Sequence, residues 1–329
     1  SKSLICIDDS RYFIYYASKR SEGSKESLLK KLDSILMKTF TKIIEDVNEK
    51  TLVIPLSGGY DSRLIVAMFK RLGHKNIICY SYGVPDNLES KISKKVANQL
   101  GFKWIFIPYT ASMWSKLWYS KFFKDFIKYG GNYSTIAHTQ DYLAVEELTS
   151  KELIPLDSIF IPGHTGDFIA GKHLKKIWDD KPIHSYNSLK NSILKAHYNL
   201  NNEWVRDLKL KRVLEQKVES VLNNFIINED YNYNQIFELW EWQERQSKFI
   251  AGSVNVYEYF NYEWRMPLWE NRDILEFFMR LPIQFKTDTI LYDYFLEEIL
   301  FEKYDLNYKK ADKVLNKKSH FREVLRRMI

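Results

Sequence analysis

The sequence predicts an α/β fold in which a parallel sheet carries helices on both faces and is extended by a mostly helical C-terminal part. Two observations lead to this prediction. Short runs that are apolar on both faces alternate with helical patterns between residues 51 and 163, as in parallel sheets that are covered on both sides. After Gly171 the strand-like pattern ends, and the remaining chain has mainly the pattern of aromatic-rich helices.

In chain order, the elements begin with two short strand-like runs around a polar turn at residues 3–17. An amphipathic helix follows from Ser24 to about Val47, with Ser24 as its N-cap. The alternating region then predicts strands at 51–56, 76–82, 104–109 and 158–163, and helices at 61–72, 88–100, 113–128 and 139–149. The predicted organisation is a short strand segment at 1–23, an α/β core at 24–175 and a helical part at 176–329.

Composition limits the classes of protein to consider. The 329 residues are 45% hydrophobic and 28% charged, which is typical of globular proteins. The apolar runs are much shorter than the roughly 20 residues that span a bilayer, so no membrane partner is expected. Cys6 and Cys79 stand in no disulfide or zinc pattern, and we expect a cytoplasmic protein. The net charge of +7 suits polyanions such as ATP or RNA without choosing between them.

The stretch "LSGGYDS" lies where the first strand of the predicted core ends and a helix begins. Ligands of parallel sheets bind at such junctions. Gly58 and Gly59 permit backbone amides to approach a charged group, and the helix N-terminus favours an anion. Ser57 and Ser62 can donate hydroxyl hydrogen bonds. Because Asp61 would repel phosphate unless a cation lay between them, the stretch predicts a nucleotide site that holds Mg²⁺.

These residues resemble the pyrophosphate loop of the PP-loop ATP pyrophosphatases, and three further segments narrow the resemblance to asparagine synthetase-like proteins. The segment "CYSYGVPDNLESKISKKVANQLGF" is similar to the family's second strand and helix. "IPGHTGDFIAGKH" resembles its S-G-x-G-x-D-E-x-x-G-G-Y segment, and "YEWRMPLWENRDILEFFMRLP" resembles its E-x-R-x-P-F-L-D stretch. The likeness extends from about residue 24 to 310 and implies an adenine nucleotide alpha hydrolase-like fold.

The resemblance also implies a reaction. A substrate carboxylate attacks the α-phosphorus of ATP, which gives an acyl-adenylate and pyrophosphate, and an amine or ammonia then displaces AMP. The enzyme would be an ATP-dependent carbon–nitrogen ligase with ATP and Mg²⁺ as cofactors and a small-molecule or peptide carboxylate as substrate. Such chemistry depends on positioning and charge neutralisation more than on a protein nucleophile.

Roles for individual residues follow from the same resemblance. Nucleotide binding is expected from Leu56, Ser57, Gly58, Gly59, Asp61, Ser62, Tyr82, Pro162 and Gly163. Asp61 and Asp167 are the expected metal ligands. The expected catalytic residues are His164, Glu263 and a lysine of "NYKKADK", for which we choose Lys310 over its neighbours Lys309 and Lys313.

The sequence departs from the family pattern beside the expected acceptor. Position 164 is His where asparagine synthetases carry Glu, Phe168 replaces an acid, and "PLWE" replaces P-F-L-D. An imidazole there can act as a base or as the partner of a carboxylate, or it can be a loop histidine satisfied by the backbone. Free aspartate is therefore not the expected acceptor.

The amino-terminal segment leaves the source of the amine open. Residues 3–17 resemble the segment that joins glutaminase to synthetase, so a glutaminase domain or subunit could supply ammonia. Two other functions remain as alternatives: a tRNA-modifying PP-loop enzyme and a non-catalytic nucleotide-binding relative. Sulfur-transfer members of the PP-loop class need a reactive cysteine pair, whereas Cys6 and Cys79 lie in apolar runs. We therefore do not expect a nucleic-acid partner.

Overall fold

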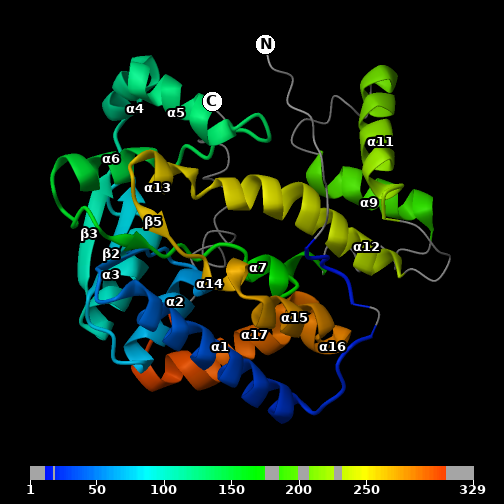
Figure 1. Cartoon of the computed structure of the whole chain (residues 1–329), viewed down its shortest axis with the longest axis horizontal. Helices are drawn as coiled ribbons and strands as arrows, with labels where there is room; N and C mark the ends of the chain where they lie inside the picture. Colours follow the sequence, from blue (N-terminus) through cyan, green and yellow to red (C-terminus); the bar gives the residue numbers. More distant parts are fainter. Residues whose placement is uncertain (1–11, 18, 175–184, 199–206, 226–231, 309–329) are drawn as a thin grey trace.

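The computed structural model describes residues 12–17, 19–174, 185–198, 207–225 and 232–308. Its centre is a five-stranded parallel sheet in the order β3-β2-β1-β4-β5 (Figure 1). The strands are β1 (Leu52–Pro55), β2 (Ile77–Gly83), β3 (Lys103–Pro108), β4 (Ile159–Phe160) and β5 (Glu263–Trp264). The predicted parallel α/β class is confirmed.

The strand order reverses beside β1. The chain moves from β1 outward to β2 and β3, and then returns to the other edge of β1 with β4 and β5. Leu52 pairs with Ile77 on one side and with Ile159 on the other. At such a reversal the loops that follow the two central strands diverge and leave a crevice beyond the carboxyl ends of the strands. The ends of β1 and β4 are therefore the place where a ligand is expected.

Alternate residues of the strands enter two separate cores, which explains why the strand sequences are apolar throughout. Leu52 and Ile54 belong to the larger core, whereas Val53 belongs to the smaller one. Helices that contribute to the larger core include α1 (Lys25–Val47), α2 (Tyr60–Arg71) and α3 (Leu88–Leu100). The smaller core is closed by α5 (Lys121–Gly131), α6 (Tyr142–Ser150) and α13 (Asn255–Tyr259).

Helix ends follow the predicted signals. The Ser24 hydroxyl accepts a hydrogen bond from the backbone N–H of Ser27 and so caps α1, as predicted. Gly101 ends α3 in the left-handed region with φ of +74°. Helix α2 begins at Tyr60, one residue before the predicted start, which makes the loop after β1 correspondingly shorter.

The remaining described chain is helical. Its α-helices are α4 (Ala111–Tyr119), α7 (Gly166–Ile169), α9 (Tyr186–His197), α11 (Leu208–Leu222), α12 (Tyr233–Trp240), α14 (Pro267–Glu270), α15 (Arg272–Arg280), α16 (Ile283–Lys286) and α17 (Ile290–Tyr294). The π-helices are η1 (Glu241–Ile250) and η3 (Phe295–Phe301), and the 3₁₀ turns are η2 (Thr287–Thr289) and η4 (Glu302–Tyr304). Within the described ranges, no helix has both the length and the apolar character needed to cross a bilayer.

Two local expectations are corrected by the structure. Glu263 and Trp264 form a fifth strand beside β4, although the sequence predicts no strand after Gly171, because two residues are too few to show a period. Residues 12–17 contain no strand, and Tyr15 and Ala17 are instead buried in the larger core. The first eleven residues of the predicted strand segment lie outside the described residues.

Candidate functional site

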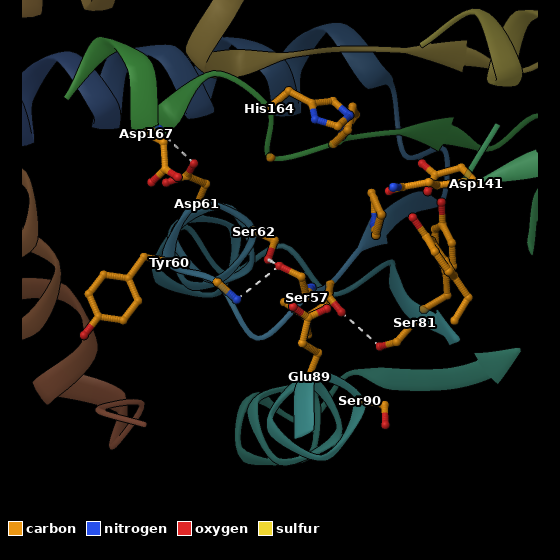
Figure 2. Close-up of a pocket in the computed structure, with 18 of the residues that line it drawn as sticks. Ser57, Tyr60, Asp61, Ser62, Ser81, Glu89, Ser90, Asp141, His164 and Asp167 are labelled. Carbon is orange, nitrogen blue, oxygen red and sulfur yellow. Dashed lines mark hydrogen bonds between the residues drawn. The ribbon is translucent and has the colours of Figure 1, made fainter. Parts of the chain in front are cut away.

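A pocket of about 430 Å³ opens at the carboxyl ends of β1 and β4, where the strand order reverses. Its walls come mainly from the loop after β1, the end of β2, the segment before α6 and the segment after β4. Most of the predicted site residues line it, namely Leu56, Ser57, Gly59, Asp61, Ser62, Tyr82, Pro162, Gly163, His164 and Asp167. The loop "LSGGYDS" and the segment "IPGHTGDFIAGKH" therefore meet in one cavity (Figure 2).

The loop after β1 is shaped by its own hydroxyl groups. Ser62 Oγ accepts the backbone N–H of Ser57 at 3.1 Å and lies 3.0 Å from Ser57 Oγ. The backbone N–H of Gly59 donates to Ser57 Oγ at 3.1 Å. The loop leads into the 12-residue helix α2, whose N-cap Gly59 provides no side-chain cap hydrogen bond and whose N-terminal dipole favours an anion. This geometry suits phosphate.

Glycine is required most strictly in the loop after β4. Gly59 has φ of −81°, which any residue adopts, so its role in the loop is compactness and not an unusual conformation. A Cβ at Gly163 would lie 2.7 Å from the backbone nitrogen of Ser62, and one at Gly166 would lie 2.3 Å from Asp61 Cγ. The two glycines let the loop after β4 lie directly against the start of α2, which brings Asp61 and Asp167 together.

The two predicted metal ligands converge as expected. Asp61 Oδ2 accepts the backbone N–H of Asp167 at 3.0 Å, and Asp61 Oδ1 accepts the hydroxyl of Tyr292 at 2.8 Å. Burial, together with the nearby Asp61 carboxylate, raises the pKa of Tyr292 well above its usual value, so this hydroxyl stays protonated and donates. Asp167 in turn forms an ion pair with Lys172, with 2.6 Å between Oδ2 and Nζ.

The donor set at this end of the pocket fits Mg²⁺ bound together with a nucleotide. Mg²⁺ is usually held by one or two carboxylates, with phosphate and water oxygens completing its octahedron. Asp61 and Asp167 supply two carboxylates beside the anion-binding end of α2. Within the described ranges no three His, Cys, Asp or Glu side chains form a metal cluster, so the phosphates would have to provide ligands.

His164 lines the pocket away from the two aspartates (Figure 2). Its ring lies edge-on to that of His138, with 6.3 Å between centroids, and its Nε2 is sealed from solvent without a described hydrogen-bond partner. Burial lowers the pKa of His164 below the usual 6.5; Asp141 opposes this shift and His138 adds to it. The imidazole is therefore neutral at pH 7.

Residues before α6 complete this part of the wall, and sequence reasoning missed them. His138, Gln140 and Asp141 all line the pocket. Asp141 is buried and accepts a hydrogen bond from the hydroxyl of Tyr257 at 2.9 Å. The three residues belong to no recognisable motif, and only their place just before α6 could have drawn attention to them.

Glu263 lies apart from the pocket, which corrects the expectation that it acts at the reacting atoms. It is the first residue of β5, at the amino ends of the parallel strands, with 53% of its side chain exposed and its Oε1 2.8 Å from Lys50 Nζ. The Lys50 hydrogen bond is the main reason that the pKa of Glu263 falls below its usual value.

Lys310 and its neighbours Lys309 and Lys313 lie outside the described residues. The described chain ends at Tyr308, whose carbonyl accepts a hydrogen bond from Arg63 Nη1 at 2.8 Å. Arg63 Nη2 also donates to the carbonyl of Gly58 at 3.1 Å. Tyr308 is therefore held close to the loop after β1.

Comparison with known proteins agrees with the sequence motifs. The family model described as asparagine synthase matches residues 47–124. Comparison with curated proteins gives no match. Among solved structures, the chain is similar to an NH3-dependent NAD synthetase from Campylobacter jejuni subsp. jejuni in complex with the nitrate ion, at 15% sequence identity and a TM-score of 0.31, over 70% of this chain and 96% of that one.

The matched segment contains the loop after β1 together with α2, β2, α3 and β3. The loop, α2, β2 and α3 contribute residues that line the pocket. The predicted resemblance is confirmed in this segment, since residues 47–124 match the asparagine synthase family model.

Proposed function

We propose that the chain is an ATP-dependent ligase that forms an amide bond. It would adenylate a substrate carboxylate with release of pyrophosphate, and then transfer the acyl group to an amine or to ammonia. The observation that carries this proposal is the convergence of the loop after β1 with Asp61 and Asp167 in one pocket. The match of residues 47–124 to the asparagine synthase family model supports it.

The aspartate end of the pocket would bind the triphosphate. The first backbone N–H groups of α2 and the hydroxyls of Ser57 and Ser62 would donate to phosphate oxygens. Asp61 and Asp167 would hold Mg²⁺, which neutralises phosphate charge when it is bound. The nucleoside would lie against Leu56, Tyr82 and Pro162, which line the pocket beside the ends of β1, β2 and β4.

The histidine end of the pocket would receive the acceptor and the amine. His164 lines the pocket and is neutral at pH 7, so its imidazole can take a proton from an amine as that amine attacks the adenylated carboxyl group. Asparagine synthetases have a carboxylate at the corresponding position, and a neutral ring does not reproduce that charge. We therefore propose a small-molecule or peptide carboxylate other than free aspartate as the acceptor, in a cytoplasmic enzyme to which a glutaminase partner could supply ammonia.

Pyrophosphate release tests the function directly. The purified protein is incubated with ATP and Mg²⁺ across a panel of carboxylates and amines, including aspartate with ammonia. We expect release with one acceptor class and no appreciable asparagine formation. Asp61→Asn and Asp167→Asn should each lower the rate by ~10²-fold or more, because both carboxylates face the phosphates.

The matched control is Asp125→Asn, since Asp125 lies exposed on α5 outside the pocket. It should leave the rate unchanged. Robust asparagine synthesis would contradict the proposed acceptor. Failure of every carboxylate to elicit pyrophosphate release, with ATP bound, would contradict the ligase and favour a nucleotide-binding role.

A further inference from the structure

Lys172 stands at the aspartate end of the pocket, and the backbone before it has little freedom. It follows Gly171, which has φ of +94°, and a Cβ at Gly171 would lie 2.4 Å from the carbonyl oxygen of Lys286. Only glycine fits this position, so the chain turns here in one fixed way. The turn aims Lys172 back towards Asp167, and both residues line the pocket.

The Lys172–Asp167 ion pair contributes little to the stability of the fold. Nζ and Oδ2 are 2.6 Å apart, but the two side chains are 50% and 52% exposed. Exposed ion pairs of this kind contribute only about 0–1 kcal/mol to folding. Their exposed surface faces the cavity, which suggests a role in binding.

Charge balance indicates what Lys172 would bind. Among the described residues that line the pocket, the carboxylates are Asp61, Glu89, Asp141 and Asp167, and Lys172 supplies the one lysine or arginine side chain. A triphosphate would bring further negative charge to the aspartate end. Lysine is a usual partner of phosphate oxygens, because its ammonium group donates charge-assisted hydrogen bonds.

Location favours phosphate over the acceptor as the ligand of Lys172. Its partner Asp167 lies beside Asp61 at the start of α2, while Asp141 lies on the opposite side of the pocket (Figure 2). A metal bound by both aspartates would draw on the same Asp167 carboxylate that Lys172 contacts. An incoming metal–nucleotide would therefore weaken the ion pair and leave the ammonium group close to the phosphates.

We propose that Lys172 binds the β- and γ-phosphates of the nucleotide, and hence the departing pyrophosphate, and that it rests on Asp167 when no nucleotide is bound. The inference depends on the ATP-binding function proposed above. It adds a chain-specific lysine to the phosphate site, since the family segment has Gly at the position that Lys172 occupies.

Calorimetry with three probes tests the role of Lys172, because only two of them carry the phosphates in question. In Lys172→Met we expect the affinities for Mg–ATP and Mg–pyrophosphate to fall about tenfold or more, with the affinity for AMP unchanged within twofold. Lys172→Arg keeps the charge and should retain most of the Mg–ATP affinity. The matched control is Lys38→Met, because Lys38 lies on α1 outside the pocket and forms an exposed ion pair with Asp273 of α15.

The outcomes separate this inference from the proposed function. If the wild-type protein binds Mg–ATP and AMP, but Lys172→Met leaves Mg–ATP affinity unchanged or weakens both ligands equally, Lys172 is not a phosphate ligand and the ATP site stands. If the wild-type protein binds neither nucleotide, the proposed function and this inference both fail. A selective loss for Mg–ATP and Mg–pyrophosphate, reversed by arginine, establishes the role.

Discussion

At the residue scale, the protonation state of His164 decides what the acceptor end of the pocket can do. Burial holds its pKa below 6.5, Asp141 opposes that shift, and His138 lies edge-on at 6.3 Å. Because the folded-state pKa is lowered, the neutral ring is fully present above about pH 6.5 and is lost as the pH falls through the lowered pKa. A role as proton acceptor is therefore available throughout the neutral range.

The rate of amide formation should follow this titration. We expect the pyrophosphate-release rate with the true acceptor to be level from pH 8 to 6.5 and to fall below it. His164→Gln, which has no titrating ring, should flatten the acid limb and lower the rate by ~10²-fold, the lower end for a lost general base. The measurement is a pH–rate profile of both proteins at saturating ATP.

His74 provides the control for this profile. Burial lowers its pKa as well, but it lies near the end of α2, away from the pocket. His74→Gln should keep both the rate and the acid limb. A near-normal rate for His164→Gln would show that His164 is a structural residue of its loop and not a general base.

Single site residues could be predicted from the sequence where they belong to a recognisable motif. Asp61 and Asp167 were predicted because each sits in a motif, and the structure brings them together. Asp141 and His138 were missed because they stand alone in a loop. Tyr292 reaches Asp61 across 231 residues of sequence, and no pattern in a single sequence encodes such a contact.

At the scale of elements, one side chain links the start of α2 to the end of the described chain. Arg63 is fully buried, and its guanidinium donates to the carbonyls of Leu306, Tyr308 and Gly58 at 2.9, 2.8 and 3.1 Å. Burial lowers its pKa to about 10, so it stays charged at pH 7. The group lies between the rings of Tyr60 and Phe301 without a carboxylate among these partners.

Arg63→Lys should loosen this connection, because a lysine ammonium cannot match the planar fork that reaches three carbonyls. We expect a loss of about 1.5–3 kcal/mol in the free energy of unfolding, the usual range for hydrogen bonds to a charged group. ATP affinity should also fall several-fold, since the carbonyl of Gly58 is held by Arg63. Urea unfolding and calorimetry measure the two effects.

Arg212→Lys, on the exposed surface of α11, is the matched control and should change the unfolding free energy by less than about 0.5 kcal/mol. Equal behaviour of the two variants would mean that Arg63 contributes packing alone.

Elements with a clear period were predicted well, and short ones were not. Helix α3 has the predicted bounds, and β1, β2 and β3 begin and end within a residue or two of their predicted positions. The predicted strand at 158–163 shortens to Ile159–Phe160, because the chain turns away early to place Gly163 against α2. Strand β5 is held by its pairing with β4 and not by its own pattern, which is also why Glu263 was placed in the wrong part of the molecule.

At the scale of the whole molecule, one continuous core crosses the predicted boundaries at 23/24 and 175/176. It contains Tyr15 from the first segment, Leu32 and Leu64 from the second, and Ile236 and Leu296 from the third. The spacing of hydrophobic residues predicts which face of a helix is buried. It does not predict which other helix or sheet packs against that face. The sequence therefore suggested a division that the packing of these residues does not follow.

A buried ion cluster joins the same three segments. Glu238 on α12 forms a short ion pair with Lys286 at the end of α16, and its carboxylate lies 3.7 Å from Arg20 and 3.5 Å from His173. Tyr15 lies 3.4 Å from Lys286 Nζ. Burial alone would raise the pKa of Glu238, but Lys286, His173 and Arg20 outweigh it and bring the pKa to about 2. The Glu238 carboxylate is therefore ionised throughout the neutral pH range.

Removing that charge should destabilise the whole molecule. Glu238→Gln leaves Lys286 buried without its partner, and we expect a loss of about 3–5 kcal/mol in the free energy of unfolding at pH 7. Because the folded pKa lies below the unfolded value of about 4.3, the stability from this ionisation is present above pH 4.3 and is lost as the pH falls towards 2. Urea unfolding at pH 7 and pH 3, followed by tryptophan fluorescence and by circular dichroism, measures both effects.

Two control variants test whether the loss of stability comes from breaking an ion pair as such or from leaving a charge buried. Glu276→Gln breaks an exposed ion pair with Arg272 on α15 and should cost less than about 1 kcal/mol. The double variant Glu238→Met with Lys286→Met should recover most of the loss, because the fully buried ammonium group is removed together with its carboxylate partner, while Arg20 keeps its hydrogen bonds to the carbonyls of Met279 and Leu281. Since the cluster and the core cross the predicted boundaries, fluorescence and circular dichroism should report one coincident transition in each protein. Two separate transitions in the wild type would mean that the helical part unfolds independently of the sheet and that this cluster does not couple them.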